Sequence, residues 1–155
     1  MNLEGSRLFQ APRDRVWAAF NDPAVLARAT PGCERLDPVG PDEYDAVLKV
    51  GIAAVKGSYK GKLGITERTP PTGYTLKIEG NGAPGFVRGE GRLTLEEQDG
   101  NTLVTIKGEA QVGGLIAAVG QRLLGSASRM LLEQFFSAME QEISQSTSKT
   151  PNVSS

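Results

Sequence analysis

Histidine is absent from this sequence of 155 residues, and cysteine occurs once. Without histidine the chain lacks the commonest general base and the commonest metal ligand, and it cannot form a Ser/His or Cys/His nucleophile pair. A single cysteine, Cys33, cannot form an internal disulfide and is typical of a reducing cytoplasm. These absences disfavour most catalytic interpretations, and we expect neither catalytic residues nor a metal site.

Long apolar runs and basic clusters are also missing. The sequence has 17 basic and 18 acidic residues and no Lys/Arg run, so it lacks the concentrated positive face that phosphate contacts need. No apolar run is long enough to cross a bilayer, and no signal pattern stands at the N-terminus. We therefore expect one domain by length, with no nucleic-acid partner.

What the sequence has instead is one long amphipathic stretch near its end. Over residues 114–144, polar and apolar side chains recur at spacings of three and four, as on opposite sides of a helix. The polar line is Arg122, Ser126, Arg129, Glu133, Ser137 and Glu140; the apolar line is Leu124, Ala127, Leu131, Phe135 and Ala138, flanked by Leu123, Leu132, Phe136, Met139 and Ile143. About 30 helical residues at ~1.5 Å each extend roughly 45 Å, longer than a small domain is wide.

The preceding residues predict strands and two short helices. Residues 3–10 alternate as a strand, and two short helices follow, separated by Asn21-Asp22-Pro23. Residues 44–112 alternate with period two between turn signals, and a short strand is expected around residues 33–39.

This order predicts an α+β fold. A curved antiparallel sheet of about seven strands wraps on the long C-terminal helix, with two short helices after the first strand. We expect the domain to span residues 1–144, and the polar residues 145–155 to form a disordered tail.

Glycines inside the predicted strands leave two alternatives open. They are Gly51, Gly61, Gly64, Gly89, Gly91 and Gly108. Glycine weakens a strand, and its use there is to let the sheet bend or to leave space where a side chain would stand. The sheet is therefore either bent over a filled core or bent over a ligand-sized cavity.

Nearly the whole chain, from Leu3 to Ile143, resembles the CoxG family of carbon monoxide dehydrogenase proteins. The segments that carry the resemblance are FQAPRDRVWAAFNDPAVLARATPGCERL, KGSYKGKLGI, GNGAPGFVRGEGRLTL and VGGLIAAVGQRLLGSASRMLLEQFF. The most specific pieces are ATPGCE at residues 29–34 and GGLIAAVGQRLL at residues 113–124. This family belongs to the START-like, helix-grip superfamily, which also contains polyketide cyclases and lipid-transfer domains.

The resemblance implies an apolar cavity between sheet and helix and no conventional active site. It also implies a molybdenum hydroxylase of the carbon monoxide dehydrogenase type as partner, and a quinone or similar lipophilic ligand that is not covalently bound. Longer members carry a C-terminal extension for membrane attachment, whereas this sequence ends in a Ser/Thr-rich stretch. We therefore expect a cytoplasmic protein that at most contacts the inner membrane surface transiently.

The residues expected to line the cavity come mainly from the long helix and the segment before it. They are Phe86, Ile116, Val119, Leu123, Leu124, Ala127, Leu131 and Phe135. A stripe of this kind is also what any helix packed on a sheet needs, so an ordinary core is the competing interpretation. Cys33 is expected to be a buried small hydrophobe, because no cationic setting for a reactive thiol is evident.

Two other functions remain open. The protein could dock or mature the dehydrogenase without a ligand. It could also be a cyclase- or dehydratase-like enzyme, whose chemistry would then depend on a carboxylate (Asp45, Glu90 or Glu109) or a tyrosine (Tyr44, Tyr59 or Tyr74).

Overall fold

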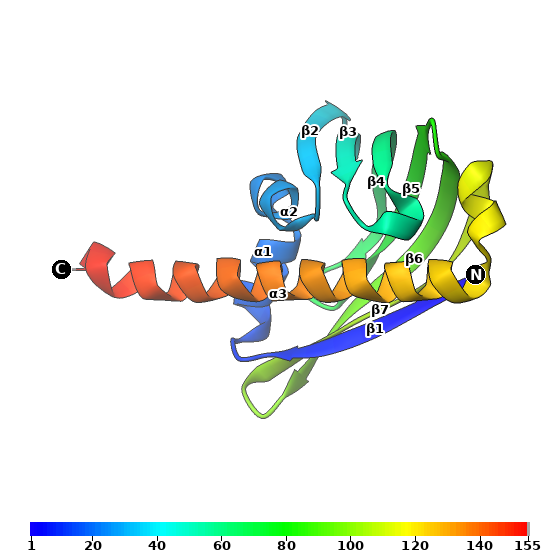
Figure 1. The fold of residues 1–155 in the computed structure, drawn as a ribbon. Coiled ribbons are helices and arrows are strands. Elements are labelled where there is room, and N and C mark those ends of the chain that lie inside the picture. Colours follow the sequence, from blue (N-terminus) through cyan, green and yellow to red (C-terminus); the bar gives the residue numbers. More distant parts are fainter. Residues whose placement is uncertain (155) are drawn as a thin grey trace.

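The computed structural model describes the backbone of residues 1–154 and the side chains of residues 1–145. One sheet of seven antiparallel strands has the order β1-β7-β6-β5-β4-β3-β2, so the first two strands lie at opposite edges (Figure 1). The strands are β1 (Asn2–Phe9), β2 (Cys33–Gly40), β3 (Glu43–Val50), β4 (Gly57–Thr69), β5 (Gly73–Gly82), β6 (Gly85–Gln98) and β7 (Asn101–Gly113). The predicted fold class is confirmed, including the short strand after the two helices.

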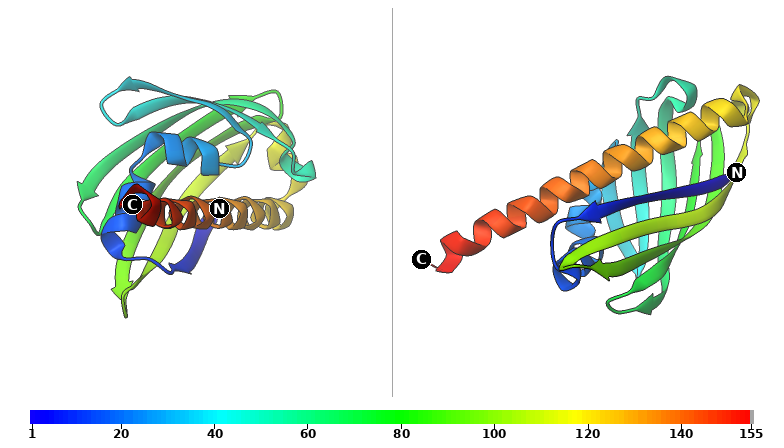
Figure 2. Two further views of the ribbon diagram at one scale, coloured as in Figure 1. Left: turned by 90° about the vertical axis from the view of Figure 1, so that its left-hand side faces the viewer. Right: turned by 90° about the horizontal axis from the view of Figure 1, so that it is seen from below.

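The helices all lie on one side of this sheet. They are α1 (Arg13–Phe20), α2 (Pro23–Ala29) and α3 (Gln121–Ser154), with the 3-10 turns η1 (Ala53–Val55) and η2 (Leu115–Val119). The view along α3 in Figure 2 shows the sheet curving around that helix. Asp22 caps α2 by accepting a hydrogen bond from the backbone N–H of Ala24, as the sequence predicts for a residue directly before Pro23.

The long helix starts later than the sequence predicts. Residues 114–120 form η2, and α3 begins at Gln121. Gly114 and Gly120 have φ values of +78° and +89°, a left-handed conformation that interrupts a helix and that glycine adopts without a steric penalty. The prediction of one continuous helix from Gly114 is therefore wrong, because it counted Gly120 as a helix interior position.

At its far end α3 extends to Ser154, beyond the end predicted near Ser144. The disordered tail predicted for residues 145–155 lies, apart from residue 145, outside the part of the chain whose side chains are described. It remains a prediction.

A packed aromatic core occupies the end of the sheet next to α1 and α2. Phe9 lies 5.6 Å from Phe20 and 6.0 Å from Phe136, measured between ring centroids, and both contacts are edge-to-face. Phe136 and Met139 of α3 are 1% and 0% exposed. Edge-to-face rings of this kind add to the stabilisation from burial alone, so this end of α3 is held firmly.

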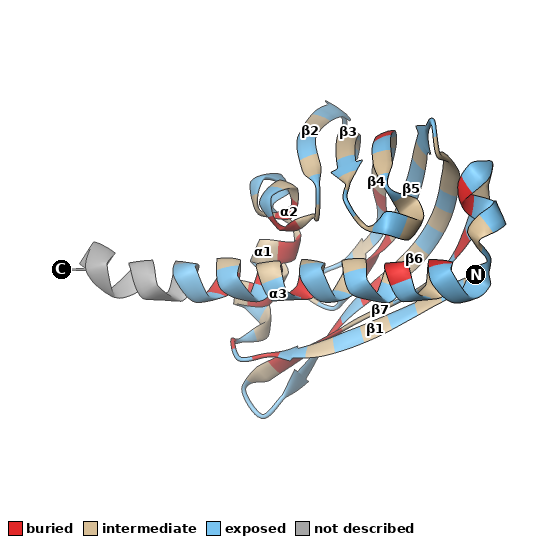
Figure 3. Cartoon of the chain, viewed as in Figure 1, coloured by how far each residue is buried: buried red, intermediate tan, exposed pale blue. Residues whose placement is uncertain are grey.

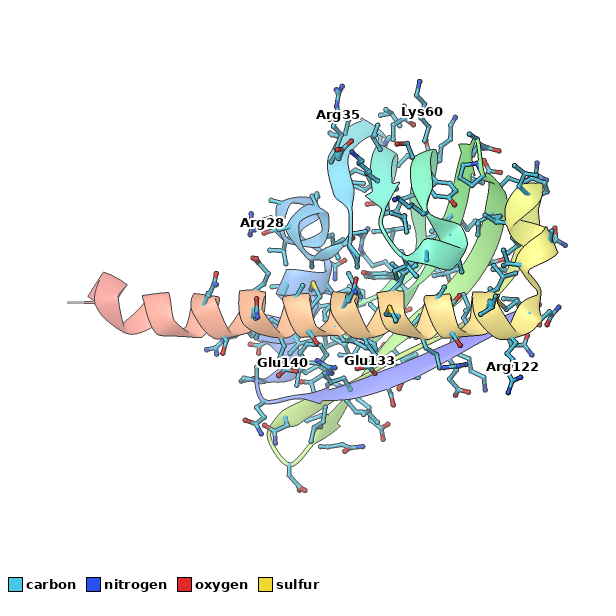
Figure 4. All side chains as sticks on the ribbon, viewed as in Figure 1. Arg28, Arg35, Lys60, Arg122, Glu133 and Glu140 are labelled. Atoms are coloured by element: carbon cyan, nitrogen blue, oxygen red, sulfur yellow. The ribbon has the colours of Figure 1, made fainter. Side chains whose placement is uncertain are left out.

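Polar contacts hold α3 to its neighbours on either side. Arg7 of β1 donates hydrogen bonds to Glu133 at 3.0 Å and to Glu140 at 3.1 Å, and Figure 4 shows both carboxylates on the β1 side of the helix. On α2, the Arg28 guanidinium donates to Glu142 at distances of 2.7–3.2 Å. The predicted polar line of the helix is thus partly a contact surface.

Candidate ligand cavity

Buried hydrophobic residues divide into two sets. One set forms the packed core around Phe9, Phe20 and Phe136. The other lies outside that core and borders a cavity of about 480 Å³ between the sheet and the first half of α3; it consists of Tyr59, Ala110, Ile116, Leu124 and Ala127. Figure 3 shows buried positions recurring along the described part of α3, so one helix serves both regions. Its first half lines the cavity, and its second half completes the core.

The cavity wall is almost wholly apolar. The strands contribute inward-facing side chains at alternate positions, such as Leu48 of β3, Leu76 of β5 and Ile106 of β7. From α3 come Leu124, Ala127, Ser128, Leu131, Leu132 and Phe135, at helical spacing. Clefts with this kind of lining bind lipophilic molecules, with a small number of polar groups setting orientation.

Two paired glycines leave room in the wall. Gly61 of β4 and Gly80 of β5 lie opposite one another in the sheet, and both border the cavity. A Cβ added at Gly80 would meet no heavy atom within 4 Å, so the space in front of it is open. At Gly61 a Cβ would lie 2.7 Å from the Glu79 carbonyl oxygen, so the close strand approach requires glycine there. Both uses of strand glycine considered from the sequence therefore occur, and Gly80 was missed by it.

The structure brings five of the eight predicted lining residues to the wall. These are Ile116, Leu124, Ala127, Leu131 and Phe135. Whether any of them contacts a ligand remains a prediction.

The structure places the other three elsewhere. Phe86 alternates with the inward-facing Val87, and its ring packs against the Arg88 guanidinium, 5.3 Å from the ring centroid. Val119 is the last residue of η2 and is half-buried. Leu123 is 51% exposed, because the start of α3 at Gln121 turns Leu124 toward the cavity and its neighbour away from it.

Polar side chains in the wall are committed to the backbone. The Tyr59 hydroxyl donates to the Val55 carbonyl at 2.7 Å, and the Tyr74 hydroxyl donates to the Phe20 carbonyl at 2.6 Å. Burial raises the pKa of both hydroxyls, so both remain protonated at neutral pH. Burial also raises the pKa of the Cys33 thiol, which keeps it uncharged, as the sequence predicts for a small buried hydrophobe.

The carboxylates considered from the sequence lie on the other face of the sheet. Asp45, Glu90 and Glu109 are exposed and each alternates with an inward-facing residue of its strand. Among the described residues, no group of three or more His, Cys, Asp or Glu side chains is placed to hold a metal ion.

At one end of the cavity, two loops with the same apolar tetrapeptide lie side by side. The sequence Ile-Ala-Ala-Val occurs at residues 52–55 and again at residues 116–119, and each copy lies within a glycine-flanked loop, residues 51–57 and 114–120. We call these the portal loops. They contain η1 and η2, which contact one another and the beginning of α3 (Figure 1). Val55 and Ile116 reach the cavity, whereas Leu115 points outward and is 75% exposed. The repeat is readable in the sequence, but its meaning depends on the two copies meeting in space.

Comparison with known proteins identifies the family. The family model for the carbon monoxide dehydrogenase protein CoxG matches residues 5–144. The chain belongs to the CoxG family. None of the curated proteins matches the chain.

Solved structures agree with this family and fold. A conserved protein from Geobacillus kaustophilus is 39% identical over 94% of this chain and 97% of its own, with a TM-score of 0.92. A START superfamily protein from Mycobacterium smegmatis is 11% identical over 93% of this chain and 97% of its own, with a TM-score of 0.73. The Zhui aromatase/cyclase from Streptomyces sp. R1128 is 13% identical over 94% of both chains, with a TM-score of 0.69. The last two show the fold alone, a START-like fold typical of ligand-binding proteins.

Proposed function

We propose that this CoxG-family protein binds and carries a lipophilic molecule, a quinone, for a molybdenum hydroxylase of the carbon monoxide dehydrogenase type. The observation that supports this most directly is the cavity of about 480 Å³ with its apolar wall. An apolar ligand gains roughly 0.8 kcal/mol for each methylene that it buries, so such a wall binds a greasy ring or tail without strong polar contacts. The family supports the choice of partner.

A non-catalytic role fits the chemistry of the wall. The carboxylates named above lie on the outer face, and the Tyr59 and Tyr74 hydroxyls already donate to backbone carbonyls. A general acid or base must reach the reacting atom of a bound molecule, and the described side chains of the wall present no carboxylate, free amine or imidazole for that task. The cyclase-like alternative would therefore need a rearrangement of the wall.

The first test is to ask what the protein carries. The purified protein is extracted with organic solvent, the extract is analysed by mass spectrometry, and the emptied protein is titrated with a short-chain quinone. We expect a lipophile in near-stoichiometric amount, or uptake of the quinone at micromolar concentration or below. A clean extract together with no uptake would mean a filled core in solution, and would favour docking or maturation of the dehydrogenase without a ligand.

We further propose that the portal loops contact the inner membrane surface when the ligand is exchanged. The most exposed large hydrophobic residue is Leu115, and exposed Ala53 stands on the neighbouring loop. Between Asp45 and Glu67, and between Glu109 and Glu133, the sequence has six basic residues and no acidic one: Lys49, Lys56, Lys60, Lys62, Arg122 and Arg129. Apolar loops with basic neighbours suit a bilayer with anionic lipids. Among the described residues no helix is long and apolar enough to span a bilayer, so the contact we propose is peripheral.

Charge reversal near the portal loops tests this contact. The double variant Lys56→Glu with Arg122→Glu is expected to bind vesicles containing anionic lipid at least about 25-fold more weakly, since each basic residue near such a surface contributes about 1 kcal/mol. Both side chains are exposed, and neither forms an ion pair among the described residues.

Binding is measured by co-sedimentation with anionic vesicles and, in parallel, with purely zwitterionic ones. Arg35→Glu is the matched control, because Arg35 projects from β2 away from the portal loops (Figure 4). Equal losses for the control and the double variant would contradict the proposed contact.

A further inference from the structure

Hydrogen-bond direction in the cavity wall carries information about the ligand. The wall contains five polar side chains of the inner face, and each donates its hydrogen to a backbone carbonyl. These bonds are Thr30 to Leu26 at 2.7 Å, Cys33 to Arg35 at 3.3 Å, Tyr59 to Val55 at 2.7 Å, Tyr74 to Phe20 at 2.6 Å and Ser128 to Leu124 at 2.8 Å.

The direction of these bonds is not ambiguous. A carbonyl oxygen has no hydrogen, so in each pair the side chain must be the donor. A hydroxyl has one hydrogen and two lone pairs, and once its hydrogen is used it offers only lone pairs to a third group. To donate to a ligand instead, a hydroxyl such as that of Tyr59 would have to leave its backbone carbonyl without a partner in an apolar setting, which is unfavourable.

Charged groups at the edge of the cavity alter this balance little. Lys62 and Glu79 border the cavity, but both are exposed and alternate with the inward-facing Gly61 and Gly80, so their side chains stand on the outer face. The terminal ammonium of Met1 also borders the cavity and donates to the Ala110 carbonyl at 2.9 Å. As a cation with three hydrogens it retains donors, and it has to be controlled for in a test.

We propose that the cavity selects a neutral lipophile that carries a hydroxyl group over the same molecule with a carbonyl group. A hydroxyl on the ligand can donate to the unused lone pairs of the wall. A carbonyl on the ligand finds no free side-chain donor there and loses the hydrogen bonds that it makes with water. This inference rests on the proposed function, since it concerns the chemistry of the molecule that the cavity takes.

For a quinone this selection has a redox consequence. A quinone takes up two electrons and two protons to become a hydroquinone, which converts two carbonyl acceptors into two hydroxyl donors. The dehydrogenase partner would supply the electrons, and water would supply the protons. If the hydroquinone binds tenfold more tightly than the quinone, the midpoint potential of the bound couple rises by about 30 mV, since the couple transfers two electrons. The cavity would thereby make its ligand a better electron acceptor than the same quinone free in a membrane.

Hexadecan-2-ol and hexadecan-2-one form a matched pair of probes, because they differ only at one carbon. Their relative binding to the emptied protein is measured by competition in native mass spectrometry. We expect the alcohol to be favoured about five- to tenfold beyond the ratio of their partition coefficients between water and hexadecane, the range of one net hydrogen bond. The comparison is repeated on N-terminally acetylated protein, which removes the donors of the Met1 ammonium.

Substitutions then assign the selectivity to the wall. Tyr59→Phe, Thr30→Val and Ser128→Ala each remove one acceptor, and at least one should return the ratio to that of hexadecane partition. Thr102→Val is the matched control, since Thr102 donates to the Ala11 carbonyl at 2.9 Å in a buried place outside the cavity.

The outcomes separate this inference from the proposed function. Binding of both probes at the partition ratio, preference for the ketone, or a preference that no wall variant changes would overturn the inference and leave the carrier function standing. Failure of both probes to bind would overturn the carrier function itself.

Discussion

Replacing Gly80 with leucine is expected to abolish most lipophile binding while leaving the fold intact. The Cβ of Gly80 would point into open space in the cavity, and its φ angle is not in the left-handed region, so leucine causes no backbone strain. A leucine side chain has four carbon atoms and displaces a similar number of ligand methylenes. At roughly 0.8 kcal/mol for each methylene, the loss is about 3 kcal/mol, which corresponds to an affinity about 100-fold lower.

The measurement is titration of the emptied variant with the quinone used for the wild type, alongside urea denaturation. Gly64→Leu is the matched control: Gly64 is also a strand glycine with nothing within 4 Å of an added Cβ, but it does not border the cavity. We expect the control to bind like the wild type. Full binding by Gly80→Leu would mean that the ligand lies elsewhere on the protein, and the carrier proposal would lose the site on which it rests.

Replacing Phe136 with alanine is expected to cost about 3–5 kcal/mol of the free energy of unfolding, the range for a fully buried aromatic side chain. Its ring is 1% exposed and lies 6.0 Å from Phe9 and 6.1 Å from Phe135, between centroids. Most small domains are stable by only about 5–15 kcal/mol, so this variant is expected to unfold at much lower urea concentration.

Leu131→Ala provides the comparison for this effect. Leu131 is half-buried and borders the cavity, so its removal enlarges an existing space and is expected to cost less than about 2 kcal/mol. Similar losses for the two variants would show that the cavity is a filled core in solution. The pair therefore tests directly the alternative that the sequence left open.

Helical periodicity was sufficient to find part of the cavity. Leu124, Ala127, Leu131 and Phe135 were selected because they recur every three or four residues, and the structure places all of them in the wall. Periodicity alone did not separate wall from core: Phe136 lies beside the wall residue Phe135 in the sequence, yet its ring is inside the packed aromatic cluster. A helix can have one apolar face that meets two different neighbours, and those neighbours come from strands distant in the chain.

Local interpretation failed where a backbone angle or a distant partner decides the direction of a side chain. Leu123 was predicted to line the cavity, but the φ of +89° at Gly120 sets where α3 begins and turns this residue toward solvent. Glu133 and Glu140 read as a solvated line, yet Arg7 from the first strand of the chain binds both. Neither outcome is encoded in the spacing of nearby residues.

The amino-acid sequence by itself determined the α+β fold class, the order of the elements, the family and the apolar stripe of the long helix. These depend on periodicity, turn residues and composition, which are local properties of the chain. Only the tertiary structure decided that part of the stripe faces an empty space, that five polar side chains around it are committed as donors, and that the two Ile-Ala-Ala-Val loops meet at its end. Those features depend on which distant segments the curved sheet brings together, and on how much volume remains between them when they pack.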